Sequence, residues 1–180
     1  RNCGAAVLGD PGVEEWIQKA DLLMTAIGAS HLESWSRTVS DAVKRRLEKG
    51  PLDIVLAENH HSPAQLVRTA LAIEDSRLGV VQSQILRSCI EPTAELIDKF
   101  GELALRVQNH SELPMDKDAI QNLDLLMSIE GVAPKPDFKL ELTRKVYTYN
   151  AINAVISYIG HLKGYQLLSK AAQDPDIRTL

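Results

Sequence analysis

The chain has 180 residues, of which 44% are apolar and 24% are charged, and its formal net charge is −4 at pH 7. This is an ordinary globular composition, long enough for one domain plus part of a second. The one dense basic run, Lys44-Arg45-Arg46, falls late in a predicted helix, where cations favour the helix dipole, so we expect no nucleic-acid partner. No apolar run reaches the length of a bilayer, and Arg1 to Gly12 lacks the apolar core of a signal peptide, so we expect no membrane segment and a cytoplasmic location.

Strand-like and helix-like segments alternate from the beginning of the chain. Residues 21–27 form a short, mostly apolar run that stops at Gly28, which predicts a buried strand. Ser30 and Glu33 have the spacing of a capping box, which predicts a helix from Ser30 to about residue 49. Gly50-Pro51 is a strong signal for its end.

The same pattern then repeats. Residues 52–57 read as a second buried strand that ends in Glu58-Asn59, and Ser62-Pro63 starts a helix that continues to about residue 75. Residues 79–86 form a third strand candidate. Strands that alternate with helices at this spacing predict an α/β fold, with a parallel sheet covered by helices on both faces.

The second half is less regular. Residues 102–107 alternate weakly and are a candidate edge strand, and residues 132–136, which include two prolines, read as a connector. From Asp137 to His161 the apolar positions follow helical spacing, which predicts one long helix. We therefore place a parallel-sheet domain at residues 1–113 and the start of a mostly helical domain at residues 114–180.

Candidate ligand-binding residues follow the predicted strands, because ligands of parallel sheets bind beyond the carboxyl ends of the strands. Gly28 allows a flat ring or a ribose to approach the backbone, although it could equally just end its strand. Asn59 offers a neutral donor and acceptor, or it caps the next turn. Arg87 follows the third strand.

The histidines and cysteines predict no metal site. The adjacent pair His60-His61 has no third ligand at useful spacing. Cys3 and Cys89 have no close spacing that suggests a metal site or a disulfide, so we expect reduced thiols.

Lys145, Asn150 and Asn153 fall within one broad sector of the predicted long helix. At about 100° per residue, Asn150 lies roughly 140° from Lys145 and Asn153 roughly 80°. A lysine near an apolar stripe can be partly desolvated, which lowers its pKa toward that of a useful base. The spacing alone equally fits an exposed lysine with two ordinary polar neighbours.

This pattern resembles the active-site helix of the mannitol dehydrogenase family, where an asparagine follows a lysine by five residues and a histidine follows three further on. The surroundings are similar to its mannitol-1-phosphate dehydrogenase branch, in the strand ending at Gly28, in the strand closing with Glu58-Asn59, and in residues 154–165. The resemblance implies that residues 1–113 are the C-terminal part of a Rossmann-like dinucleotide-binding domain, hence an incomplete Rossmann-like sheet. Residues 114–180 would then begin the helical substrate domain.

The resemblance also implies a reaction. Lys145 would be the general base toward an alcohol while hydride passes to NAD or NADP, and Asn59 and Asn150 would polarise the alcohol oxygen. Asn153 would contact the substrate, and Gly28, Glu58 and Asn59 would face the cofactor. The expected substrate is a polyol, a sugar phosphate or a sugar acid, and the expected state is a monomer or a homodimer.

Three departures from the family pattern stand out. Asn153 replaces the family histidine, and Leu86 replaces the aspartate of the family's Val-Asp-Arg strand end. No Gly-x-Gly-x-x-Gly occurs in the 180 residues, so the pyrophosphate-binding turn is missing from this sequence, which leaves open whether the chain alone is active. Two alternatives therefore stay open: a non-catalytic relative that binds a sugar or a partner, and an unrelated α/β binding module.

Overall fold

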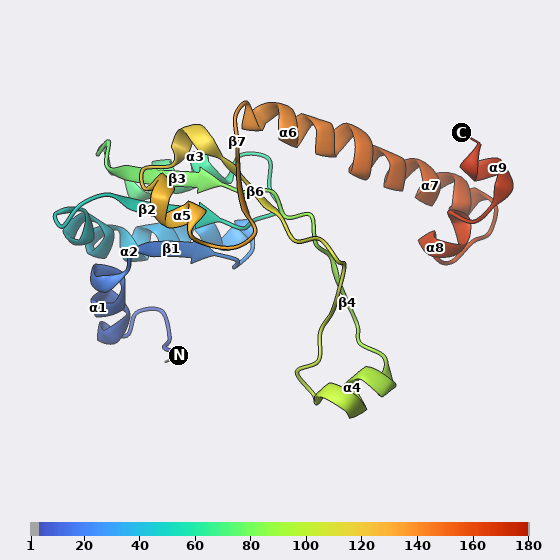
Figure 1. The fold of residues 1–180 in the computed structure, drawn as a ribbon, viewed down its shortest axis with the longest axis horizontal. Coiled ribbons are helices and arrows are strands. Elements are labelled where there is room, and N and C mark those ends of the chain that lie inside the picture. The colour runs from blue at the N-terminus through green and yellow to red at the C-terminus, as the bar shows by residue number, and fades with distance from the viewer. Residues whose placement is uncertain (1–3, 180) are drawn as a thin grey trace. The chain divides into compact units, whose positions relative to one another are not determined.

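The computed structural model describes residues 4–179, which divide into two compact units, residues 4–136 and residues 137–179 (Figure 1). The first unit contains a three-stranded sheet in the order β1-β2-β3. Its strands alternate with helices along the chain: α1 (Pro11–Lys19), β1 (Leu22–Thr25), η1 (Ala29–His31), α2 (Leu32–Leu47), β2 (Leu52–Leu56), α3 (Pro63–Leu71) and β3 (Leu78–Gln82). Both strand pairs are parallel, so the predicted α/β fold with a parallel sheet is confirmed.

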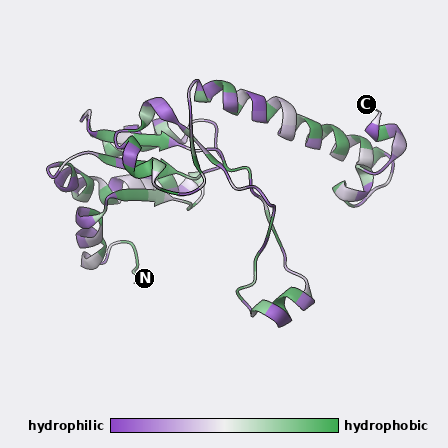
Figure 2. Cartoon of the chain, viewed as in Figure 1, coloured by the Kyte–Doolittle hydropathy of each residue, from purple (hydrophilic) through white to green (hydrophobic). Residues whose placement is uncertain are grey.

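The central strand β2 is buried on both faces. Its residues Leu52, Ile54 and Leu56 face a core formed with α1, α2 and α3, to which Val43 and Val67 contribute. Val55 points to the opposite face and packs with residues of β3, β6 and α5 in a second cluster. Burial on both faces explains why this strand is almost continuously apolar in sequence (Figure 2).

The remainder of the first unit adds two short ribbons. β4 (Cys89–Ile90) and β5 (Arg106–Val107) pair antiparallel, with α4 (Ala94–Phe100) between them along the chain. β6 (Leu113–Asp116) and β7 (Val132–Lys135) pair parallel and enclose η2 (Lys117–Ala119) and α5 (Leu123–Met127). β6 lies beside the end of β3, where the Gln84 amide donates to the Pro114 carbonyl at 2.8 Å.

The second unit is helical. α6 (Phe138–Lys145) continues through a π-helical turn, η3 (Val146–Asn150), into α7 (Ala151–Leu162), and α8 (Leu168–Ala171) and α9 (Pro175–Arg178) follow. The predicted long helix from Asp137 to His161 thus exists, interrupted by the π turn. Beyond it, the carboxylate of Asp174 accepts hydrogen bonds from Lys163 Nζ and the Tyr165 hydroxyl, which ties the last turns to the end of α7.

Some predicted boundaries differ from the structure. Residues 114–136, predicted to belong to the helical segment, contribute β6, α5 and β7 to the first unit. The segment 132–136, interpreted as a connector, contains β7 and ends where the second unit begins. The predicted capping box is wrong, because residues 29–31 form a 3-10 turn and α2 begins only at Leu32. Which unit binds cofactor and which binds substrate stays a prediction.

Candidate active site

The three strands of the main sheet end at one level. Thr25, Leu56 and Gln82 are aligned across the sheet, and the Ala57 amide donates to the Thr25 carbonyl at 2.9 Å. The residues that follow β1 and β2 therefore share the carboxyl edge of a parallel sheet, where ligands of such sheets bind.

Glu58 joins the ends of β1 and β2. It is only 5% exposed, and its two carboxylate oxygens accept the backbone amides of Ile27 and Gly28 at 2.9 and 3.0 Å. Gly28 has a φ of 85°, a left-handed conformation that favours glycine. The structure thus brings Glu58 and the Gly28 backbone together through a direct hydrogen bond, whereas their role toward a cofactor stays a prediction.

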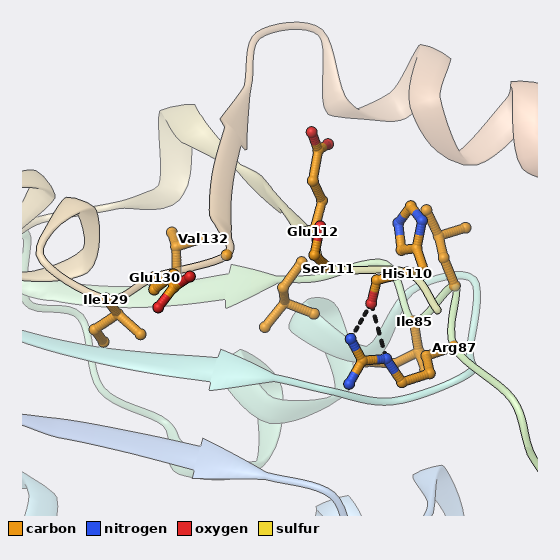
Figure 3. Close-up of a pocket in the computed structure, with 11 residues that line it drawn as sticks. Ile85, Arg87, His110, Ser111, Glu112, Ile129, Glu130 and Val132 are labelled. Atoms are coloured by element: carbon orange, nitrogen blue, oxygen red, sulfur yellow. Dashed lines mark hydrogen bonds between the residues drawn. The ribbon is translucent and has the colours of Figure 1, made fainter. Parts of the chain in front are cut away.

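Asn59 follows Glu58 directly and is exposed at the same edge. Arg87 lies further from the end of β3 and is engaged elsewhere. Its guanidinium donates from Nε and Nη2 to the carbonyl of His110, with the Nε bond at 2.8 Å (Figure 3). Arg87 thereby secures the segment before β6.

A cavity of about 350 Å³ opens beside Arg87 and His110 (Figure 3). Glu112, Glu130 and Val132 also line it, whereas Gly28, Glu58 and Asn59 do not. The Nε2 atom of His110 is buried and has no hydrogen-bond partner among residues 4–179. The cavity is therefore separate from the Gly28–Asn59 edge.

The paired histidines serve the turn into α3. His60 Nδ1 accepts the Ser62 amide at 3.1 Å, and the rings of His60 and His61 lie 4.5 Å apart. Among residues 4–179, no group of three or more histidine, cysteine, aspartate or glutamate side chains is placed to hold a metal ion. Cys89 is free and exposed, whereas Cys3 lies outside the described residues.

Lys145, Asn150 and Asn153 all lie on the long helix of the second unit, and the π turn falls between the first two. In this turn the Ala151 amide donates to the Val146 carbonyl, five residues back instead of four. A π turn contains one more residue than an α-helical turn. Two residues that are five apart in sequence therefore lie more nearly on the same face of the helix than they do in a regular α-helix. Lys145 and Asn150 are five apart. Their angular separation is therefore smaller than the roughly 140° that regular geometry gives.

Lys145 is half-buried, and this burial lowers the pKa of its ammonium group below the ordinary value of 10.5. The direction agrees with the sequence-based expectation of a partly desolvated lysine. Asn150 and Asn153 are exposed, as are Tyr149 and Ile152 beside them. The described helix thus presents an amine of lowered basicity and two neutral amides, a set able to accept a proton and to hydrogen-bond an oxygen.

The candidate residues therefore fall into two groups. Gly28, Glu58 and Asn59 lie together in the first unit, and Lys145, Asn150 and Asn153 lie along one helix of the second. That Lys145 faces Asn59 stays a prediction.

Sequence reasoning missed a second buried carboxylate. Asp53 in β2 is fully buried, and its oxygens accept the amides of Gln121 and Asn122 at 2.9 and 2.8 Å. The signal was present, because an aspartate inside an otherwise apolar buried strand needs hydrogen-bond donors. The π turn carries no comparable signal in the sequence.

Comparison with known proteins shows what the chain resembles. It is 28% identical over 173 residues to a mannitol-1-phosphate 5-dehydrogenase of Caldanaerobacter subterraneus subsp. tengcongensis. The matched region covers 90% of this chain and 43% of the relative. It is 26% identical over 177 residues to a mannitol-1-phosphate 5-dehydrogenase of Clostridium acetobutylicum, which covers 93% of this chain and 45% of the relative. The resemblance inferred from the sequence is confirmed. Relatives with the same name occur in Lactiplantibacillus plantarum and Anoxybacillus flavithermus, at 26% and 25% identity.

The chain spans less than half the length of these mannitol-1-phosphate 5-dehydrogenases. No family model matches the chain. Among the helices of residues 4–179, none combines the length and the apolar character needed to cross a membrane.

Proposed function

We propose that the protein is an oxidoreductase that transfers a hydride between NAD or NADP and a polyol, a polyol phosphate or a sugar acid. The observation that carries this proposal is the similarity to mannitol-1-phosphate 5-dehydrogenases over about nine-tenths of the chain. The lowered pKa of Lys145 supports it, because a lysine accepts a proton only in its uncharged form and a lower pKa makes that form easier to reach.

The described residues fit one end of a dinucleotide. Gly28 leaves its edge of the sheet open, since a Cβ added there would meet only the His31 ring, at an ordinary 3.7 Å. The missing Gly-x-Gly-x-x-Gly leaves these 180 residues without the usual pyrophosphate turn. We therefore propose that Gly28, Glu58 and Asn59 belong to the edge that receives the nicotinamide end.

In the proposed mechanism, the uncharged Nζ of Lys145 accepts the proton of the substrate hydroxyl and becomes an ammonium group. The side-chain amides of Asn59 and Asn150 donate hydrogen bonds to the same oxygen, which stabilises the negative charge that develops as the proton leaves. When bound, NAD or NADP supplies the hydride acceptor. Asn153 hydrogen-bonds a neighbouring hydroxyl of the substrate. A cytoplasmic location and a monomeric or dimeric state stay predictions.

The test is a spectrophotometric assay of the complete protein with NAD and with NADP. The panel contains polyols, their phosphates and sugar acids, and we expect turnover with at least one polyol phosphate. Absence of turnover with every compound and both cofactors would contradict the proposal.

A second candidate is a non-catalytic relative that binds a sugar or a partner. Asn153 favours it, because an amide cannot share a proton as the family histidine can, and Leu86 stands where the family has a carboxylate. Binding of polyol phosphate by calorimetry without turnover would support this candidate.

A further inference from the structure

The carboxylate of Glu58 is hydrogen-bonded to the protein backbone through both oxygens, which leaves it turned away from a ligand at this edge. It lies at the edge where substrates of parallel sheets bind, yet it is 5% exposed and both oxygens are turned toward the protein. Each oxygen accepts one backbone amide of the consecutive residues Ile27 and Gly28. A buried carboxylate with two backbone donors is held in one orientation.

We propose that Glu58 is a positioning residue that fixes the Gly28 backbone and the Asn59 side chain relative to one another. This inference rests on the proposed function, in which Asn59 polarises the substrate oxygen and Gly28 faces the cofactor. In this role the Glu58 carboxylate contacts the backbone amides of Ile27 and Gly28 instead of a ligand, which replaces the expectation that Glu58 faces the cofactor. It acts by tying the turn after β1 to the turn after β2.

The covalent geometry explains why the orientation of Glu58 also determines the direction of the Asn59 side chain. Asn59 is joined to Glu58 by one peptide bond, so a rotation of the Glu58 backbone re-aims the Asn59 side chain. Gly28 has no side chain to restrict its backbone, which adopts the left-handed φ of 85°. The Glu58 hydrogen bonds supply that guidance. Displacement of a positioned group by about 1 Å can cost on the order of a hundredfold in rate.

Asp53, in β2, provides a matched control for Glu58, which follows the same strand. Like Glu58, it is a buried carboxylate whose two oxygens accept two consecutive backbone amides, those of Gln121 and Asn122. Asp53 lies near the beginning of β2, whereas Glu58 follows its end. The two residues therefore make the same kind of hydrogen bonds but lie at opposite ends of β2.

The experiment compares Glu58→Gln with Asp53→Asn in the complete protein. Each substitution keeps one carbonyl oxygen and turns an amide NH₂ toward the second backbone donor, so each leaves one amide without an acceptor. We expect both variants to lower Tm by similar amounts. Only Glu58→Gln should lower kcat, by about tenfold to a hundredfold, while KM for the dinucleotide changes little.

A second readout does not depend on turnover. In amide NMR spectra, Glu58→Gln should shift the side-chain amide signals of Asn59 and the backbone signal of Gly28, whereas Asp53→Asn should leave both unchanged. If the wild-type protein turns over no substrate, the proposed function fails, and the spectra alone decide the role of Glu58. Unchanged Asn59 signals in Glu58→Gln, equal kcat in the two variants, or a loss confined to the dinucleotide KM would each overturn the inference.

Discussion

Replacing Gly79 with alanine tests whether the buried carboxylate of Asp53 can move to make room for one additional methyl group. A Cβ at position 79 would collide with a carboxylate oxygen of Asp53, and it would lie 2.8 Å from the Ala119 carbonyl oxygen and 3.0 Å from Asp53 Cγ. None of these neighbours is the end of a flexible side chain, because the carboxylate is held by the amides of Gln121 and Asn122.

The cost of this substitution has two parts. Overpacking of a core typically costs about 1–3 kcal/mol, and a displaced carboxylate loses hydrogen bonds worth about 1.5–3 kcal/mol each. If one of the two bonds is lost, the free energy of unfolding falls by about 2.5–6 kcal/mol, a large part of the roughly 5–15 kcal/mol that stabilises a typical domain.

Urea denaturation followed by circular dichroism measures this loss. Gly12→Ala is the matched control, because Gly12 lies in α1 with no atom within 4 Å of an added Cβ. We expect this control to be neutral or stabilising by up to about 1 kcal/mol. A Gly79→Ala variant whose stability differs from wild type by less than about 0.5 kcal/mol would refute the reasoning.

Four further predictions concern the proposed catalytic residues and the binding of the dinucleotide. Because burial lowers the pKa of Lys145, kcat/KM for alcohol oxidation should rise with pH to a plateau through an apparent pKa below 10.5, and Lys145→Arg, which stays protonated, should be inactive throughout. The lowered pKa also makes stability depend on pH. Between the pKa of Lys145 in the folded protein and 10.5, only the unfolded chain holds the proton, so the contribution of Lys145 to the free energy of unfolding should rise with pH. Urea denaturation of wild type and Lys145→Met at several pH values measures this rise. The 180-residue chain alone should bind NADH weakly or not at all for lack of a glycine-rich turn, and micromolar affinity in calorimetry would argue against this. Asn153→His should raise kcat by restoring the family's proton-sharing partner, and an unchanged or lower kcat would show that this position does not limit the reaction.

The parallel sheet could be predicted because its signals are local. Each strand is a short apolar run, and Gly28 and Gly50-Pro51 mark where elements end. β2 is buried along its whole length, and such strands stand out in sequence. Because parallel strands end at the same edge of a sheet, the strand predictions alone indicated that Gly28 and Asn59 lie at one edge.

Features that depend on distant contacts could not be predicted in this way. β6 and β7 each contain a proline, Pro114 and Pro134, which argues against a strand in a sheet interior, and the two indeed pair as a separate two-stranded sheet in which neither strand is central. The acceptors of the Ile27 and Gly28 amides lie 31 and 30 residues further along the chain, in Glu58. Neither feature leaves a periodic pattern in the sequence.

The helix of Lys145 shows a different limit. Periodicity predicted one helix from Asp137 to His161, and helical residues were found there. The π turn at Val146–Asn150 changes the phase between Lys145 and Asn150 without changing the residue types that a helix accepts. The apolar positions Ile152, Val155 and Tyr158 follow helical spacing, yet their side chains are exposed in the second unit.

Substitution of Lys145 tests the central claim most directly. In the complete protein, Lys145→Ala should lower kcat for polyol phosphate oxidation by about a hundredfold or more, the usual worth of a positioned general base. The circular dichroism spectrum and Tm should stay close to wild type, because Lys145 is only half-buried on its helix. Turnover equal to wild type with alanine at position 145 would contradict the assignment of Lys145 as the base.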